Sequence, residues 1–525
     1  MPSAKTLAAT IKARPHFWLL ALILVLAAVV RCWDLSGLPM GLHGDEGIVG
    51  YEARRILREG SIGPYSPASF GQPAGPIYFS ALGIALNGNE ILSIRAWSAI
   101  FGVLTVLALF FVARASLGAS SALLCAFSLA TLCWHVHYSR IAFPLVAWPL
   151  MCVLIIGALQ PAQIQKRARW WIGAGFLNGL GVYAYKAHPL FGLIALAIAA
   201  WVLLRDDATP SKRWAWLGLY LAAAVLAANF LMRYALDPAN NYGGQFAMTS
   251  IFNGADWKAL DAWPQKLWFL AARYLNWWDW MIFHPAVDTT DGAGIMPMIS
   301  PILAGLALLG LLAYWRREPL VQWSRWIIIL MPLAAVVTND GLARRTFALA
   351  PFLCVLAVVG AVELVRWGRQ FSGKRAFAAR LMPGVVGVLI AAHAAFSWHA
   401  YFVTFARAPV QAWVFCDELT TALAYMRALP PSRPIYFYSS RWSITYDTRK
   451  FLAPDINARD GSLEFAPDQQ LLWPPPAQDH AVWVLLDSYK ARAPELQALF
   501  PDAKLLIGAP SRAEVGEPAF VVLEN

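Results

Sequence analysis

Charged residues are scarce in this sequence of 525 residues. Only 14% of the residues are Asp, Glu, Lys or Arg, and 59% are hydrophobic, whereas a soluble domain has about 25% charged residues. This scarcity excludes an ordinary soluble protein and predicts a polytopic membrane protein. The net charge of +11 does not indicate a nucleic-acid partner, because most basic residues fall in short loops between apolar runs, where they set the topology.

Several motifs that carry chemistry are also absent. The six cysteines include no CxxC pair and lie mostly inside apolar runs, so neither a disulfide framework nor a zinc site is expected. There is no Walker loop and no dinucleotide fingerprint, which leaves cytoplasmic nucleotide chemistry without support. We expect no cofactor, and a divalent metal is compatible with the sequence without being implied by it.

What the sequence has in abundance is apolar runs of membrane-spanning length, each near the ~20 residues that a bilayer requires. Lys5, Lys12 and Arg14 precede the first run, which we interpret as an uncleaved first helix with a cytoplasmic N-terminus. The basic loops then fall on the inside, and an odd number of spans places the C-terminus outside. The eleven predicted spans are 16–33, 91–114, 119–136, 142–160, 170–185, 188–204, 214–234, 299–315, 323–338, 346–366 and 380–402.

Two long outer loops and a C-terminal domain complete the predicted organisation. The loop at about 34–90 contains a stretch with helical periodicity from Asp45 to Glu59, which predicts a helix on the membrane surface. The loop at about 235–298 is rich in tryptophan, as an interfacial belt would be, and a substrate contact there is an equal alternative. From about 410 the apolar runs shorten, so residues 1–405 form the membrane domain and residues 410–525 a small α/β domain. That domain shows no catalytic motif, and packing, acceptor recognition or assembly all remain open. Its predicted strands are 434–439, 481–486, 504–507 and 519–523, and its predicted helices are 417–429 and 493–500.

The middle of nearly every span lacks charge, although ion-coupled transporters usually need buried acids or bases there. Chemistry should therefore lie at the outer mouth. Asp45 is either only the cap of a helix or a base, and Glu46 follows it in the first turn. Lys186, Arg344 and Arg345 suit a phosphate, or else extend to lipid headgroups. The other ionisable residues expected near this face are Arg95, His135, His137, Arg140 and His188, and histidines in such positions are more often packed than ligands.

Five segments in this order resemble the membrane glycosyltransferases of the GT-C fold, specifically the bacterial relatives of protein O-mannosyltransferases and of the aminoarabinose transferase. The resemblance covers about 35–400, and its first segment is the most specific. After Arg140, where many relatives have an acid, this chain has Phe143 and Pro144, so Glu46 or Asp34 would have to supply a second acidic contact. The matching segments are Leu38–Gly47, Arg95–Gly102, His137–Phe143, Tyr183–Lys186 and Arg344–Pro351.

The resemblance implies an all-α polytopic membrane protein of GT-C type with a small C-terminal α/β extracytoplasmic domain. It implies Asp45, with Glu46 beside it, as the catalytic acids, and Lys186, Arg344 and Arg345 at the phosphate of a polyprenyl-phosphate-linked sugar donor. Arg140, His137, His188 and Tyr183 become candidate substrate contacts. The acceptor is a protein, a lipid or a glycan.

We therefore predict an inverting glycosyltransferase in the bacterial inner membrane, with its active site and C-terminal domain on the periplasmic or outer side. Its partners are the lipid-linked donor, an unknown acceptor and the bilayer. The competing hypothesis is a transporter or flippase of lipid-linked sugars with the same cationic mouth, and a third is a scaffold subunit for cell-wall enzymes.

Overall fold

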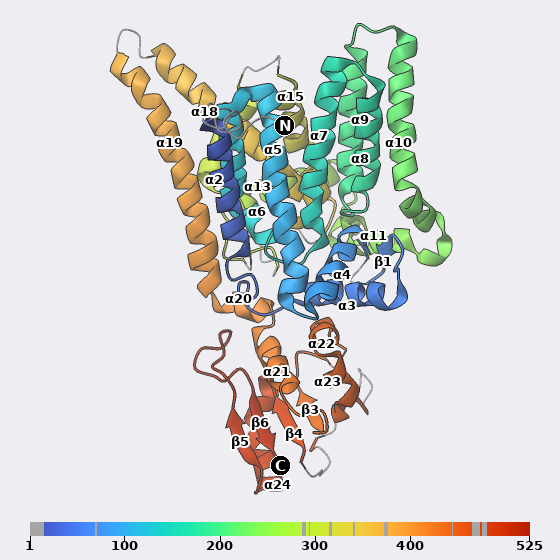
Figure 1. Ribbon diagram of the computed structural model, residues 1–525, viewed down its shortest axis with the longest axis vertical. Helices are drawn as coiled ribbons and strands as arrows, with labels where there is room; N and C mark the ends of the chain where they lie inside the picture. Colours follow the sequence, from blue (N-terminus) through green and yellow to red (C-terminus); the bar gives the residue numbers. More distant parts are fainter. Residues whose placement is uncertain are drawn as a thin grey trace, which may run out of the picture.

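The computed structural model describes residues 15–68, 71–285, 290–292, 294–313, 318–339, 342–371, 376–443, 445–464, 473–474 and 480–525. A bundle of long helices forms the larger part, and a small mixed domain lies at one end of it (Figure 1). The long helices are α2 (Pro15–Cys32), α5 (Ile91–Thr131), α7 (Ala147–Gln165), α8 (Ala168–Gly181), α9 (His188–Leu204), α10 (Pro210–Leu236), α14 (Pro301–Leu312), α15 (Pro319–Leu330), α18 (Ala350–Phe371) and α19 (Ala376–Trp398).

Helix α5 contains two membrane crossings. Its 41 residues would measure about 60 Å if straight, twice the thickness of a hydrocarbon core. Gly118 interrupts it with φ 80° and ψ 171°, a backbone conformation that glycine adopts at little cost. The Arg31 side chain bonds Ala130 O at 3.0 Å, and a Cβ on Gly102 would lie 2.8 Å from its Nε. Residues 102 and 130 thus lie at one level, so the helix doubles back at Gly118.

Within the described residues, seven helical segments are long and apolar enough to span a membrane when α5 is counted once. Counting α5 as two, and adding α8 and the shorter apolar helices α9 and α14, gives a helix for each of the eleven predicted spans. The prediction of a mostly helical, multi-pass membrane protein is confirmed.

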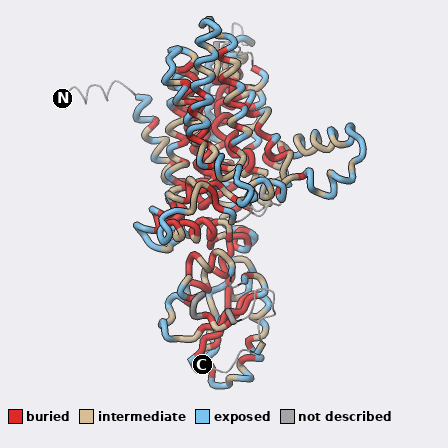
Figure 2. Tube along the Cα trace, turned by 90° about the vertical axis from the view of Figure 1, so that its right-hand side faces the viewer, coloured by how far each residue is buried: buried red, intermediate tan, exposed pale blue. Residues whose placement is uncertain are grey.

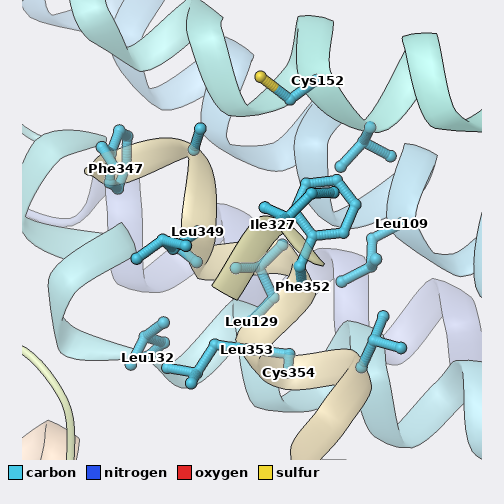
Figure 3. Packing of buried hydrophobic residues seen from close by; sticks show 14 of the residues in the cluster. Leu109, Leu129, Leu132, Cys152, Ile327, Phe347, Leu349, Phe352, Leu353 and Cys354 are labelled. Carbon is cyan, nitrogen blue, oxygen red and sulfur yellow. The ribbon is translucent and has the colours of Figure 1, made fainter. Parts of the chain in front are cut away.

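The centre of the bundle is packed with side chains from α5, α7 and α18. Leu109, Leu129 and Phe352 meet there (Figure 3). Figure 2 shows buried residues concentrated in the interior of the bundle. Helix α10 is different, because large apolar side chains such as Leu226 and Phe230 are 71% and 70% exposed. Such an apolar outer face requires lipid around it.

The first outer loop folds into two short helices joined by a hairpin. These are α3 (Gly44–Glu59) and α4 (Gly75–Asn87), connected by β1 (Tyr65–Ser66) and β2 (Gln72–Pro73), and α3 agrees with the predicted surface helix. The segment before α7 contains α6 (Cys133–Tyr138) and η1 (Pro144–Val146). Helices α3 and α4 lie at the end of the bundle that faces the small domain (Figure 1).

The second outer loop is mostly helical. It contains η2 (Pro238–Asn240), α11 (Tyr242–Thr249), η3 (Ile251–Asn253), α12 (Ala255–Lys258) and α13 (Trp263–Ile282). A separate segment between α15 and α18 contains α16 (Leu333–Val336), α17 (Leu342–Arg345) and η4 (Phe347–Leu349). The predicted tryptophan belt is mixed in character. Trp268 is 72% exposed, whereas Trp277 is 1% exposed and donates from Nε1 to Leu342 O at 3.2 Å.

The C-terminal domain contains a four-stranded sheet in the order β3-β4-β6-β5. Strands β3 and β4 are parallel, and β6 is antiparallel to both β4 and β5. All four predicted strands and both predicted helices are present at their expected places. Between α19 and this domain lie η5 (His399–Thr404), η6 (Phe405–Arg407) and α20 (Pro409–Val414). The domain itself contains α21 (Asp417–Arg427), β3 (Ile435–Tyr438), α22 (Asp447–Leu452), α23 (Pro454–Arg459), η7 (Gly461–Glu464), β4 (Val482–Leu485), η8 (Asp487–Arg492), α24 (Ala493–Leu499), β5 (Lys504–Ile507) and β6 (Val521–Glu524).

Candidate functional site

The N-terminus of α3 places Asp45 at the end of the bundle that faces the C-terminal domain, which is the mouth predicted from the sequence. His43 is the cap of this helix: its Nδ1 accepts the Asp45 N–H at 3.0 Å, and its own N–H donates to Glu46 Oε2 at 3.3 Å. The expectation that Asp45 itself caps the helix is therefore wrong. His43, and not Asp45, therefore does the capping.

Glu46 is buried and fully engaged. Arg95 contacts both of its oxygens at 2.8 Å, and the Ala142 N–H donates to Oε1 at 2.9 Å. Neither Glu46 nor Arg95 has an exposed side chain. The same guanidinium binds the carbonyls of Leu35, Pro39 and Gly41. A carboxylate held in this way positions the loop and the start of α3, and we assign Glu46 that role in place of catalysis.

Asp45 lies in a different environment, because its side chain is 34% exposed. Arg344 Nη1 is 3.6 Å from its Oδ2, and Arg344 Nε is 3.3 Å from Oδ1 of Asp291. Asp291 is itself buried, accepts the Ala343 N–H at 3.1 Å and bonds the Tyr138 hydroxyl. Asp291 therefore fixes α17, and α17 holds Arg344 beside Asp45.

Arg345 and Lys186 lie close to this group. Arg345 is buried and donates from Nη1 to the Tyr185 hydroxyl at 3.4 Å. Lys186 follows Tyr185 in the turn between α8 and α9 and is half-buried. The structure thus places Arg344 beside Asp45 and puts Arg345 against Tyr185, the neighbour of Lys186, although residues 185 and 345 are 160 positions apart in the sequence.

Arg140 and His137 are buried and bind the backbone. Arg140 donates to the carbonyls of Val30, Trp33, Asp34 and Leu38. His137 Nε2 lies 2.8 Å from Thr290 O. These contacts attach α2 and the second outer loop to α6, so these two residues shape the site from outside it.

His188 and Tyr183 also make interhelical contacts. Trp148 Nε1 donates to His188 Nδ1 at 3.1 Å, and His188 Nε2 lies 2.8 Å from Asn178 O. The Tyr183 hydroxyl donates to Ala227 O at 3.0 Å. The two side chains connect α8 with its neighbours α7, α9 and α10.

Sequence reasoning missed Asp291 and Tyr138. The signal for Asp291 was present, because it is an acid followed by Gly292 in an outer loop, a combination typical of turns. Among the residues that the structure describes, no three His, Cys, Asp or Glu side chains are grouped as metal ligands.

Residues 71–232 match the sequence model of a family described as dolichyl-phosphate-mannose-protein mannosyltransferase. This part of the chain is similar to the membrane glycosyltransferases of that family. The matching region runs from the β1–β2 hairpin through most of α10 and includes Lys186. A comparison with curated protein sequences gives no match.

The chain has the fold of ArnT from Cupriavidus metallidurans. The structure of that protein bound to undecaprenyl phosphate is similar with a TM-score of 0.55 and 16% identity, over 97% of each chain. Its apo structure gives a TM-score of 0.54 and 16% identity, over 98% of each chain. An oligosaccharyltransferase from Archaeoglobus fulgidus has a TM-score of 0.46 and 15% identity, over 83% of this chain and 61% of that one. The predicted GT-C fold and the predicted resemblance to this family are confirmed.

Proposed function

We propose that this glycosyltransferase moves a sugar from a polyprenyl-phosphate donor to an acceptor hydroxyl, with inversion at the anomeric carbon. The observation that carries the proposal is the partly exposed carboxylate of Asp45 within 3.6 Å of Arg344, with Arg345 and Lys186 at the same mouth. The family description and the undecaprenyl phosphate bound by ArnT support a lipid-phosphate donor.

The three cations suit the donor phosphate. An arginine guanidinium matches a phosphate with two parallel hydrogen bonds, and lysine adds a compact charge. Arg344 is held by Asp291 and Arg345 by burial, so their positions are set before substrate binds. Fixed positive charge of this kind stabilises the anion that develops on the leaving phosphate.

Asp45 is the general base of the proposed reaction. It accepts the proton of the acceptor hydroxyl as that oxygen forms a bond to the anomeric carbon. The bond from the anomeric carbon to the phosphate oxygen breaks on the opposite face. Its electron pair leaves with polyprenyl phosphate, so inversion follows and no nucleotide is consumed.

The donor tail requires an apolar path from the cations into the bilayer. Helix α9 begins at His188, two residues after Lys186. Ile194 lies six residues further along this helix, or about 9 Å. From there a groove of about 260 Å³ runs between α9 and α15, lined by Ile194, Ala197, Ile198, Trp201, Trp323, Trp326 and Leu330. We infer that isoprenoid units occupy this groove.

The test compares purified wild type with Asp45→Asn and Glu59→Gln, using radiolabelled polyprenyl-phosphate sugars. Glu59 is an acid on the same helix that pairs with Arg58 at the surface, so Glu59→Gln is the matched control. We expect Asp45→Asn to keep donor binding and to lose about 10²- to 10⁴-fold in turnover, the usual contribution of a general base. The control should behave as wild type.

A flippase would give another result. Transbilayer movement of the donor in reconstituted vesicles would then continue, and Asp45→Asn would affect it only mildly. Donor binding without turnover by wild type, together with such movement, contradicts the transferase proposal.

A further inference from the structure

Helix α3, which carries Asp45, lies directly against the C-terminal domain. Its glycines at 44, 47 and 50 form one face, and each leaves no room for a side chain. A Cβ on Gly44 would lie 2.7 Å from the Tyr446 hydroxyl, and one on Gly47 would lie 2.5 Å from Thr448 N. A Cβ on Gly50 would overlap the Phe451 ring. The backbone of α3 therefore packs flush on α22 and the residue before it, as the adjacent positions of α3 and α22 in Figure 1 also show.

Hydrogen bonds hold this contact at both ends of the helix. Before α3, the Thr448 hydroxyl donates to Leu42 O at 3.0 Å, and the Leu42 N–H donates to Thr420 Oγ1 at 3.1 Å. Further along, Arg54 Nη1 donates to Lys450 O at 2.8 Å. The C-terminal domain is thus fixed to the element that positions the proposed base.

Tyr446 lies at the end of the contact that is nearest to Asp45. Its hydroxyl is at Gly44, one residue before Asp45, and 3.4 Å from Cys416 Sγ. A thiol is a weak hydrogen-bonding group, so the hydroxyl keeps capacity for a stronger partner. Burial, then the neighbouring Cys416 and Asp45, raise the pKa of Tyr446. The hydroxyl therefore stays protonated and can donate.

The two parts of the protein bring different chemistry to Asp45. The membrane part supplies cations, which suit the donor phosphate. The C-terminal domain supplies a neutral hydroxyl, which suits the hydroxyl group of an acceptor. We propose that Tyr446 binds the acceptor beside Asp45, so that the C-terminal domain forms the acceptor side of the active site. This assignment rests on the transferase function proposed above.

Tyr446→Phe tests the assignment because it keeps the ring and removes only the hydroxyl. Tyr425→Phe is the matched control: Tyr425 is in the same domain, and its hydroxyl bonds Glu524 away from α3. The full-length protein in detergent is given the lipid-linked sugar that wild type consumes fastest, with glycerol as a surrogate acceptor. Two products are then measured: glyceryl glycoside, which reports transfer to glycerol, and free sugar, which reports hydrolysis of the donor. Water competes with glycerol for the same donor, so the ratio of the two products reports acceptor binding.

We expect Tyr446→Phe to lower the ratio of glycerol transfer to hydrolysis about fivefold, the effect of one lost hydrogen bond. The KM for donor should be unchanged, and Tyr425→Phe should match wild type. An unchanged ratio in Tyr446→Phe overturns the assignment and leaves the transferase function intact. If wild type consumes no donor at all, the proposed function fails, and the assignment fails with it.

Discussion

Asp45 and Glu46 are neighbours in the sequence, yet their carboxylates have opposite surroundings. Glu46 points into the protein and is held by Arg95 and two backbone N–H groups, whereas Asp45 stays partly exposed beside Arg344. A buried carboxylate with every oxygen occupied cannot accept a proton from a substrate without losing those bonds. We therefore propose Asp45, and not Glu46, as the base, and assign Glu46 the role of keeping the loop in place.

Breaking the buried pair should destabilise the protein. Glu46→Leu leaves the Arg95 guanidinium buried without its carboxylate, which typically costs about 3–5 kcal/mol. We expect a clearly lower melting temperature in detergent, measured by thermal unfolding. Arg58→Ala is the control, because it removes a surface partner of Glu59. It should change the melting temperature little, because exposed ion pairs contribute little to stability. Equal melting temperatures for the two variants would contradict a structural role for Glu46.

At the scale of elements, α3 couples the two domains through its glycine face. Gly47 lies against the backbone of Thr448, and a backbone atom cannot rotate away as a side chain can. Any added volume there has to displace α22 or α3. Because Asp45 lies on the same helix, that displacement also moves the proposed base.

Gly47→Ala should therefore reduce both stability and activity. Overpacking of this kind costs about 1–3 kcal/mol, and the displaced base should lower turnover further. Gly173→Ala is the matched control, since a Cβ on this helical glycine of α8 meets nothing within 4 Å. Thermal unfolding and donor turnover are measured for both variants. A Gly47→Ala protein with the stability and turnover of wild type would show that the interface is not tight.

At the scale of the whole molecule, the distribution of basic residues between the two ends of the bundle indicates the membrane topology. Figure 1 places the turn between α7 and α8 and the turn between α9 and α10 at the end opposite the C-terminal domain. These turns carry Lys166, Arg167, Arg169, Arg205, Lys212 and Arg213. Basic loops stay in the cytoplasm, so we propose that Asp45 and the C-terminal domain face outward.

Cysteine labelling tests this topology. Cys32 is the exposed native cysteine and the other five are buried, so Cys32→Ser provides a silent background. We expect a membrane-impermeant maleimide to label Ser488→Cys in intact spheroplasts and Ser211→Cys only after permeabilisation. Both positions are exposed, so labelling in detergent controls for reactivity. The reverse pattern in spheroplasts would overturn the proposed orientation.

The sequence by itself determined the elements. Spans and strands were predictable because a bilayer requires a fixed length of apolar residues and because a short apolar run is typical of a buried strand such as β3 or β4. The outward cations at 186, 344 and 345 were identifiable because they break the charge rule for outer loops. None of these signals depends on distant contacts.

Only the tertiary structure decided which groups meet. It placed Arg344 between Asp45 and Asp291, in contact with both. It also placed Tyr446 against the helix that carries Asp45. It also showed that Arg140, His137, His188 and Tyr183 hold helices together, although their residue types suit a substrate equally well. The burial and the hydrogen-bond partners of a side chain are set by segments that are distant in the sequence. Local periodicity therefore cannot predict them.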